Sequence, residues 1–353
     1  MDILALLPDT RAGRHTEWLW SRMLAISRGS PPFDAKELAE HFSPSVFAQI
    51  SADQLAAHFV QLAPTMTLVT RLVEEASSDQ CYTALLAFPD YWLRYTCQAQ
   101  DDEPQLLIEA GYSLALDPTC YSDQRVQRDG RDVTIRDFGG KGPLMLLLHG
   151  AGSDLTSWEA LVPCLEGFHV IAQDLPGHGR SPLKVFTFDD ALADADVIVA
   201  EFKQGPPIIL GHSLGGYIGL RYAATHRCGG WIGLDGPFAL VYPWDTDDAE
   251  FTETINQISR EICAIDVARS LAAMSCPAML LLCAVAASPI EEPLVPSRQE
   301  LAEHVARYHP KIRIEWVQTG HDMVMFHQPQ VIGATIRDFL YRPDDDPTEL
   351  IRV

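Results

Sequence analysis

The spacing of apolar residues predicts helices in the first part of the chain. Helical periodicity marks residues 14–28, 34–42 and 51–63. Asp34 and Ser51 stand at the starts of the second and third segments, and each is followed three residues later by Glu or Gln. This arrangement is typical of a capping box, in which two side chains satisfy backbone N–H groups where a helix begins.

A different pattern, rich in Thr, Val, Tyr and Leu, follows in residues 66–74, 81–88, 91–98 and 105–115. The turn-like sequences SSDQ, FPD and QDDEP separate these segments. Helices followed by a run of strands predict an α+β unit, which we place at residues 1–120.

Strands alternate with helices after residue 120. A hairpin is expected around Asp129-Gly130, which is a favoured turn dipeptide. Apolar runs typical of buried parallel strands occur at residues 144–150, 168–174, 207–213, 230–236, 276–283 and 312–320. The pattern predicts an α/β domain at residues 121–341, with a doubly wound, mostly parallel sheet and a ligand site beyond the carboxyl ends of its strands. Residues 342–353 are expected to form an acidic tail.

Composition narrows the function classes. The chain has 353 residues, of which 47% are hydrophobic and 21% are charged, as in ordinary globular proteins. Its 26 basic and 48 acidic residues give a formal charge of −22, which argues against nucleic acid and anionic membranes as partners.

No apolar run approaches the roughly 20 residues of a membrane span, and the N-terminal sequence lacks the features of a secretion signal. We therefore expect a cytoplasmic protein whose eight scattered cysteines are reduced core thiols, with no metal or organic cofactor.

The strongest chemical signal is the segment Gly211-His212-Ser213-Leu214-Gly215, which fits the pattern GxSxG. An apolar strand is predicted before it and a helix after it. A nucleophile in such a sharp strand-to-helix turn needs small residues on both sides, and the turn exposes its side chain at the N-terminus of the helix. Ser213 is therefore the predicted nucleophile.

Two further motifs, HGAG at residues 149–152 and DLPGHGRS at residues 174–181, resemble those of the α/β-hydrolase superfamily, as does the GxSxG turn. The motifs occur in the family's order and spacing across residues 124–341. The resemblance implies the α/β-hydrolase fold and an oxyanion hole made by the backbone N–H groups of Ala151 and Leu214. It also implies that the histidine of HGAG is structural.

The general base of this family follows the last strand, in a Gly-His pair with a proline several residues later. Gly320, His321 and Pro329 match that arrangement. The resemblance therefore implies that His321 takes the proton of Ser213 and later returns it to the leaving group.

The acid that orients the base has more than one candidate position. Most α/β-hydrolases carry Asp shortly after the seventh strand, where this chain has no carboxylate before Glu291 and Glu292. Some, including haloalkane dehalogenases, carry the acid after the sixth strand, which here ends at Asp235. We favour Asp235, while Glu291, Glu292 or a dyad without an acid stay open, as does a structural role for Asp235.

A short cap is expected at about residues 237–270, between the sixth and seventh strands. Its aromatic residues could line an acyl pocket or pack on the core. Together with the loop near the nucleophile, the cap supplies the candidate pocket residues Gly150, His212, Phe238 and Trp244.

The start of the chain is similar to a second kind of domain. The pieces LPDTRAGRHTEWLW, ELAEHFSPSVFAQI and QLAAHFVQLAP resemble the N-terminal domain fused to certain actinobacterial serine β-lactamase-like enzymes. The resemblance implies a cone-like fold of the ketosteroid-isomerase type. Isomerase activity is not implied, because no pair of acids can be placed in one pocket, and we expect a role in packing or oligomerisation.

These residues predict an enzyme. Serine forms an acyl-enzyme, whereas haloalkane dehalogenases and epoxide hydrolases have Asp at the nucleophile position. We expect hydrolysis of a carboxylic ester, thioester or lactone of a small molecule. Alternatives are an acyltransferase or lyase of the same fold, and a non-catalytic ligand-binding scaffold. The oligomeric state is left open, a homodimer included.

Overall fold

The chain divides into two compact units, Met1–Asp117 and Pro118–Val353, with the boundary close to residue 120. Each unit is described here by itself. The computed structural model describes residues 2–48, 50–181, 186–244, 253–286, 291–322 and 324–341. The expected acidic tail and residues 245–252 of the expected cap lie outside the described residues.

Helices come first in the N-terminal unit. They are the 3-10 helices η1 (Leu4–Leu6) and η2 (Ala63–Leu68) and the α-helices α1 (Arg11–Ser27), α2 (Ala35–Ala39), α3 (Pro44–Phe47) and α4 (Ala52–Leu62). The Asp34 carboxylate accepts the N–H of Glu37 at 2.8 Å, and Ser51 and Gln54 form a capping box at the start of α4. The helix starts expected at these two residues are confirmed.

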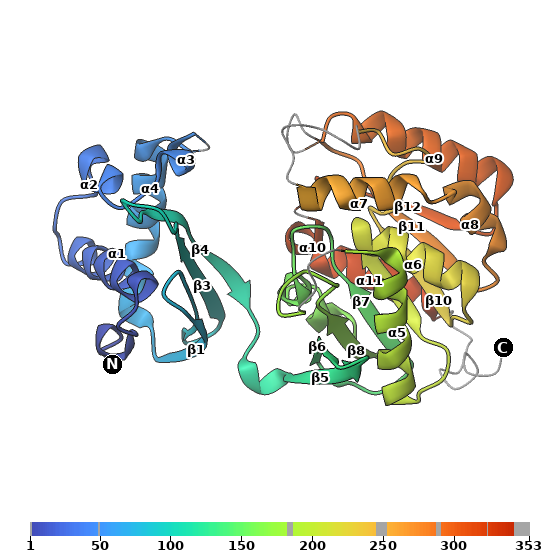
Figure 1. Cartoon of the computed structure of the whole chain (residues 1–353), viewed down its shortest axis with the longest axis horizontal. Coiled ribbons are helices and arrows are strands. Elements are labelled where there is room, and N and C mark those ends of the chain that lie inside the picture. The colour runs from blue at the N-terminus through green and yellow to red at the C-terminus, as the bar shows by residue number, and fades with distance from the viewer. Residues whose placement is uncertain are drawn as a thin grey trace. The chain divides into compact units, whose positions relative to one another are not determined.

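A four-stranded antiparallel sheet follows, in the order β1-β2-β3-β4 (Figure 1). Its strands are β1 (Arg71–Ser77), β2 (Cys81–Ala87), β3 (Trp92–Ala99) and β4 (Leu107–Ala115). The strand expected at residues 66–74 is wrong in its first half, because the chain stays helical through Leu68. Pro64 suits the start of η2, and the hydroxyls of Thr65 and Thr67 donate to carbonyls three residues earlier at 2.6 and 2.8 Å.

The helices and sheet of the N-terminal unit enclose an aromatic core. Trp20 of α1 meets Tyr95 of β3 with ring centroids 5.0 Å apart, and Phe42 meets Phe59 of α4 at 5.9 Å. All four side chains are buried. The unit therefore has a hydrophobic core of its own, as an independent domain requires.

The C-terminal unit is built on an eight-stranded sheet in the order β12-β11-β10-β9-β7-β8-β6-β5. β5 and β6 form an antiparallel hairpin, β6 is antiparallel to β8, and the other neighbours are parallel. The strands are β5 (Ser122–Arg128), β6 (Arg131–Asp137), β7 (Leu144–Leu148), β8 (His169–Gln173), β9 (Ile208–His212), β10 (Gly230–Leu234), β11 (Ala278–Cys283) and β12 (Arg313–Val317). The predicted α/β architecture with a mostly parallel, doubly wound sheet is confirmed.

Helices connect these strands and pack on the sheet (Figure 1). They are α5 (Phe188–Phe202), α6 (Leu214–Thr225), α7 (Glu253–Cys263), α8 (Val267–Ala273), α9 (Leu294–Tyr308), α10 (Val324–His327) and α11 (Pro329–Leu340), with the 3-10 helices η3 (Pro118–Cys120), η4 (Leu155–Trp158) and η5 (Val162–Cys164).

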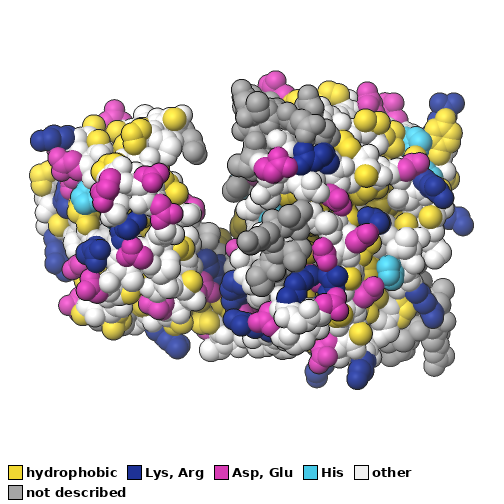
Figure 2. Space-filling model, in the orientation of Figure 1, with side chains coloured by type: hydrophobic (Ala, Val, Ile, Leu, Met, Phe, Trp, Pro, Cys, Tyr) yellow, Lys and Arg dark blue, Asp and Glu magenta, His cyan; other side chains and the backbone are white. Residues whose placement is uncertain are grey.

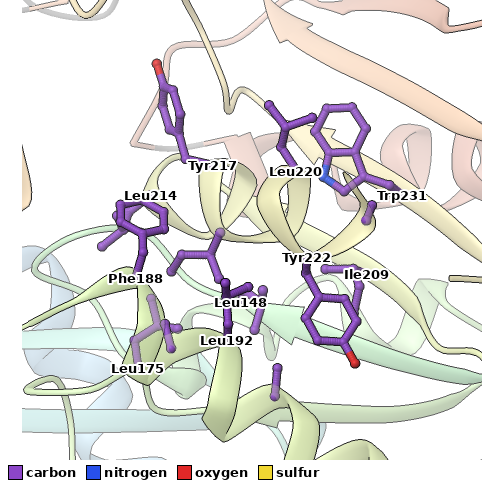
Figure 3. Close-up of a cluster of buried hydrophobic side chains, with 14 of the residues drawn as sticks. Leu148, Leu175, Phe188, Leu192, Ile209, Leu214, Tyr217, Leu220, Tyr222 and Trp231 are labelled. Atoms are coloured by element: carbon purple, nitrogen blue, oxygen red, sulfur yellow. The ribbon is translucent and has the colours of Figure 1, made fainter. Parts of the chain in front are cut away.

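Each face of this sheet has its own hydrophobic cluster. Along β7, Leu146 and Leu148 belong to one cluster and Met145 and Leu147 to the other, because successive side chains of a strand point to opposite faces. Figure 3 shows the first cluster, in which Leu148 lies below α6. Since every residue of β7, β9 and β10 is buried, these central strands form a rigid support for the loops at their carboxyl ends.

Candidate active site

The predicted nucleophile lies in a strained turn between β9 and α6. Ser213 has φ +50° and ψ −116°, and α6 begins at the next residue. A Cβ on Gly211 would lie 2.1 Å from the carbonyl oxygen of Gly215, and a Cβ on Gly215 would lie 2.0 Å from that of Leu148. Only glycine fits at these two positions, which is why the GxSxG pattern and the turn occur together.

The three residues predicted to form the triad lie in one hydrogen-bonded chain. Nε2 of His321 is 2.9 Å from Oγ of Ser213, and Nδ1 of His321 is 2.6 Å from Oδ2 of Asp235. An ionised carboxylate can only accept, so Nδ1 carries the proton and Nε2 is left to accept the serine O–H. The side chains come from the ends of β9 and β10 and from the segment after β12, which meet at one edge of the sheet.

The Asp235 carboxylate is fully buried and receives four hydrogen bonds from the part of the chain that the structure describes. Besides His321, its donors are the backbone N–H of Cys283 at 2.9 Å and Nε and Nη2 of Arg298 at 2.8 and 2.5 Å. Burial alone would raise the pKa of Asp235, but the hydrogen bonds and charges of His321 and Arg298 outweigh it and lower the pKa to about 2. The carboxylate therefore stays ionised at neutral pH.

Arg298 is a site residue that the sequence reasoning missed. A signal for it exists, since the buried positions of α9 are Leu294, Arg298, Leu301 and Val305, which lie on one helical face. A charged residue inside an apolar stripe is rarely buried without a partner of opposite charge. The partner itself could not be named from the helix pattern.

The alternative acids are placed differently from Asp235. Oε2 of Glu291 accepts the backbone N–H of His321 at 2.9 Å, and Glu291 is buried. Glu292 is exposed. Asp235 therefore contacts the imidazole ring of His321, whereas Glu291 contacts the backbone N–H of the same residue.

Leu214 directly follows the nucleophile, and Ala151 directly follows a glycine that packs against it. Leu214 is the first residue of α6, so its N–H has no acceptor within the helix. Ala151 follows Gly150, where a Cβ would lie 3.3 Å from Cβ of Ser213. The loop after β7 is tied to the turn by the N–H of Gly215, which donates to the carbonyl of His149 at 3.1 Å.

The candidate pocket residues separate into two groups. The ring of Phe238 stands edge-on to His321, with centroids 5.6 Å apart, and Trp244 meets Phe238 at 5.5 Å. His212 is instead buried, and its Nε2 donates to the carbonyl of His321 at 3.1 Å. Its ring thus supports the backbone of His321, while its place in the pocket stays a prediction. Gly150 packs against His212 and Ser213.

His149 is also held by the backbone. Its Nε2 accepts the N–H of Leu175 at 3.0 Å, so its Nδ1–H donates to the carbonyl of Gly150 at 2.8 Å. This agrees with the structural role expected for the histidine of the HGAG motif. Burial is the main cause that lowers the pKa of His149 to about 4 and that of His212 to about 3.

These two histidines make the folded state sensitive to acid. Both stay neutral in the folded chain, whereas an unfolded histidine binds a proton below about pH 6.5. Above pH 6.5 the rings are neutral in both states, so the folded state keeps its full stability. As the pH falls from 6.5 toward 4, the unfolded chain binds protons that the folded chain does not, and the free energy of unfolding decreases. We expect the free energy of unfolding in urea to be about 2–3 kcal/mol lower at pH 5.5 than at pH 7.5.

A variant separates this effect from other titrations. His149→Gln removes one of these two rings, so the difference between the two pH values is expected to fall by about 1–1.5 kcal/mol, while His15, His41 and His178, whose pKa values burial also lowers, keep contributing. An equal free energy of unfolding of the original chain at both pH values would contradict the assignment of neutral, buried rings.

The remaining polar groups give little sign of further chemistry. Among the described residues, no group of three or more His, Cys, Asp or Glu could hold a metal ion, and no helix is long and apolar enough to cross a membrane. All eight cysteines are free, but the expectation of core thiols is wrong for Cys120 and Cys263, which are exposed. On the face shown in Figure 2, acidic and basic side chains are interspersed.

Comparisons with known proteins bear on the fold of the C-terminal unit. A family model for the α/β hydrolase fold matches residues 143–257. Epoxide hydrolase B of Mycobacterium tuberculosis is 31% identical over 107 residues, which cover 28% of this chain and 30% of that protein. Protein phosphatase methylesterase 1 of Mus musculus is 31% identical over 125 residues, which cover 32% of each chain. The chain thus spans about a third of the length of these curated relatives.

The N-terminal unit matches a different family model. Residues 7–87 match the model for the N-terminal part of an ORF 12 gene product. The resemblance to a ketosteroid-isomerase-like domain is not confirmed by this match.

A solved structure extends the similarity beyond the length that the family model matches. The crystal structure of E-2-(acetamidomethylene)succinate hydrolase aligns with a TM-score of 0.51 and 19% identity, covering 62% of this chain and 99% of that one. At this identity the alignment shows the fold alone. Together with the family match and the sheet order, it shows that the C-terminal unit has the α/β-hydrolase fold.

Proposed function

We propose that the C-terminal unit is a serine hydrolase that cleaves a carboxylic ester, thioester or lactone of a small molecule. The observation that carries the proposal is the chain of contacts from Ser213 through His321 to Asp235, at 2.9 and 2.6 Å. Relatives named esterase, lipase and methylesterase support a hydrolase in general.

The proposed reaction follows from the tautomer of His321. Its Nε2 accepts the proton of Ser213 while Oγ attacks the carbonyl carbon of the substrate. The tetrahedral intermediate carries an oxyanion, for which the N–H groups of Ala151 and Leu214 and the N-terminus of α6 supply stabilisation. His321 then protonates the leaving group, and the acyl-enzyme remains on Ser213.

Water completes the cycle by the same route. His321 takes a proton from water, the hydroxide attacks the acyl carbon, and collapse of the second intermediate returns the proton to Ser213. Asp235 stabilises the imidazolium in both halves because its carboxylate is ionised and fixed. An acyltransferase would use the same first half with another acceptor in place of water.

The nucleophile separates this proposal from the activity in one relative's name. Epoxide hydrolases carry Asp where this chain has Ser213, and a carboxylate attacks an epoxide carbon to form an ester. A serine oxygen instead forms an ester by acylation. The match to epoxide hydrolase B therefore supports the fold, while Ser213 favours cleavage of an acyl group.

Covalent labelling tests the proposal. A fluorophosphonate probe is expected to react rapidly with the folded chain, and peptide mapping by mass spectrometry is expected to place the adduct on Ser213. Ser157→Ala should label normally, because the Ser157 hydroxyl donates only to the carbonyl of Asp154. A panel of esters, thioesters and lactones would then define the substrate. A folded chain that takes no label would favour the ligand-binding scaffold.

A further inference from the structure

Helix α9 carries an arginine into the centre of the C-terminal unit. The side chain of Arg298 has no exposed surface and lies on the same helical face as Leu294, Leu301 and Val305. A buried guanidinium is costly unless a charge of opposite sign neutralises it. Its partner is the equally buried carboxylate of Asp235.

The contact between Arg298 and Asp235 has two parallel hydrogen bonds. Nε donates to Oδ1 at 2.8 Å and Nη2 donates to Oδ2 at 2.5 Å. Oδ2 is also the atom that accepts Nδ1–H of His321. Because a guanidinium is planar and rigid, this contact fixes the plane of the carboxylate and so the direction in which Oδ2 faces the imidazole.

The positive charge of Arg298 lies beside the carboxylate that contacts His321. Among the described residues, two carboxylates contact His321: Asp235 contacts its ring, and Glu291 accepts its backbone N–H. Its sequence neighbour Asp322 is exposed. His212, which packs against the ring, is neutral, and so is the thiol of Cys283, because burial raises its pKa. Among these groups, Arg298 supplies the single positive charge.

We propose that Arg298 is a positioning residue for the proposed hydrolysis, which aligns the Asp235 carboxylate with the His321 imidazole and partly neutralises the charge of that carboxylate. This inference rests on the proposed function. An unpaired carboxylate beside an imidazole favours the imidazolium, and a fixed positive charge on the far side of the carboxylate weakens that effect.

The test is the pH profile of the second-order rate constant for fluorophosphonate labelling of Ser213. In Arg298→Met, which removes the charge, the half-maximal rate on the acid side is expected to move up by about 1–2 pH units. In Arg298→Lys, which keeps a positive charge, it is expected to stay within about 0.3 pH units of the original chain while the maximal rate falls.

A second buried arginine provides a matched control for stability. Arg136 is paired with Asp123 and Glu159, neither of which belongs to the triad. Arg136→Met is expected to lower the melting temperature and leave the midpoint of the pH profile unchanged. Arg298→Gln, which removes the charge but keeps a donor, replaces the methionine variant should that variant not fold, and carries the same expected shift.

The outcomes separate this inference from the proposed function. Absence of labelling in the original chain would overturn the hydrolase itself. Normal labelling of the original chain, with the same midpoint in the methionine and original chains, would overturn the role of Arg298 alone. Equal shifts in the lysine and methionine variants would show that the charge of Arg298 does not set the midpoint, and failure of both neutral variants to fold would assign Arg298 to stability. Either result would also overturn the inference.

Discussion

Replacing Asp235 by Asn is expected to lower the acylation rate of Ser213 by about 10⁴-fold. The amide cannot stabilise the imidazolium, and its NH₂ group can donate to Nδ1, which would turn the ring to the tautomer that cannot accept the serine proton. The measurement is the rate constant for fluorophosphonate labelling at the pH optimum, together with single-turnover hydrolysis of an activated ester.

Glu291→Gln is the matched comparison, because Glu291 contacts the same histidine through its backbone. The glutamine oxygen can still accept that N–H, so the acylation rate of the Glu291→Gln variant is expected to stay within about tenfold of the original. A larger loss in Glu291→Gln than in Asp235→Asn would transfer the role of the acid to Glu291.

Stability needs its own control in this experiment. Asp235→Asn leaves Arg298 as an uncompensated buried charge, which typically costs about 3–5 kcal/mol. The double variant Asp235→Asn with Arg298→Met removes both charges. It is expected to recover the melting temperature without recovering the acylation rate, which would show that the rate loss arises from chemistry and not from unfolding.

Ser213→Ala and His321→Ala are each expected to lower kcat by about 10⁶-fold, and the double variant by about the same factor. The two side chains act as one unit: without the base the serine is not activated, and without the serine the base has no proton to take. Steady-state hydrolysis of the best ester in the panel measures all three variants.

His327→Ala is the control for this series. His327 lies six residues after His321, and its Nδ1 contacts the hydroxyl of Thr319 at 3.1 Å. Its kcat is expected to stay within about twofold of the original, like that of surface and structural substitutions away from the reacting atoms. A double variant whose loss in kcat equals the product of the two single losses would contradict a shared role of Ser213 and His321.

Local motifs predicted the nucleophile and the base because their chemistry is tied to backbone geometry. Gly211 and Gly215 must be glycine wherever β9 turns sharply into α6, so the sequence of the turn reports its shape. The apolar runs likewise predicted β7, β9 and β10, since strands buried on both faces have few polar residues.

The acid and its partner could not be derived in the same way. Asp235 and Glu291 both follow strands whose carboxyl ends meet at one edge of the sheet, so the strand pattern brings both near His321. Which of them meets the ring depends on side-chain directions set by tertiary packing. Asp235 and Arg298 are 63 residues apart in the sequence. The one sequence signal of their contact is the charged residue on the apolar face of α9.

The order of strands also decides when the site can exist during synthesis. β9 lies in the middle of the sheet, and β10, β11 and β12 add outward in chain order. Ser213 is therefore made well before His321, which follows β12 and lies 108 residues later. At about 5–20 residues per second, a ribosome needs roughly 5–20 s to add that stretch. A nascent chain therefore lacks the partner of Ser213 until the last strand has been made, so under the proposed function hydrolytic activity would report completion of the whole sheet.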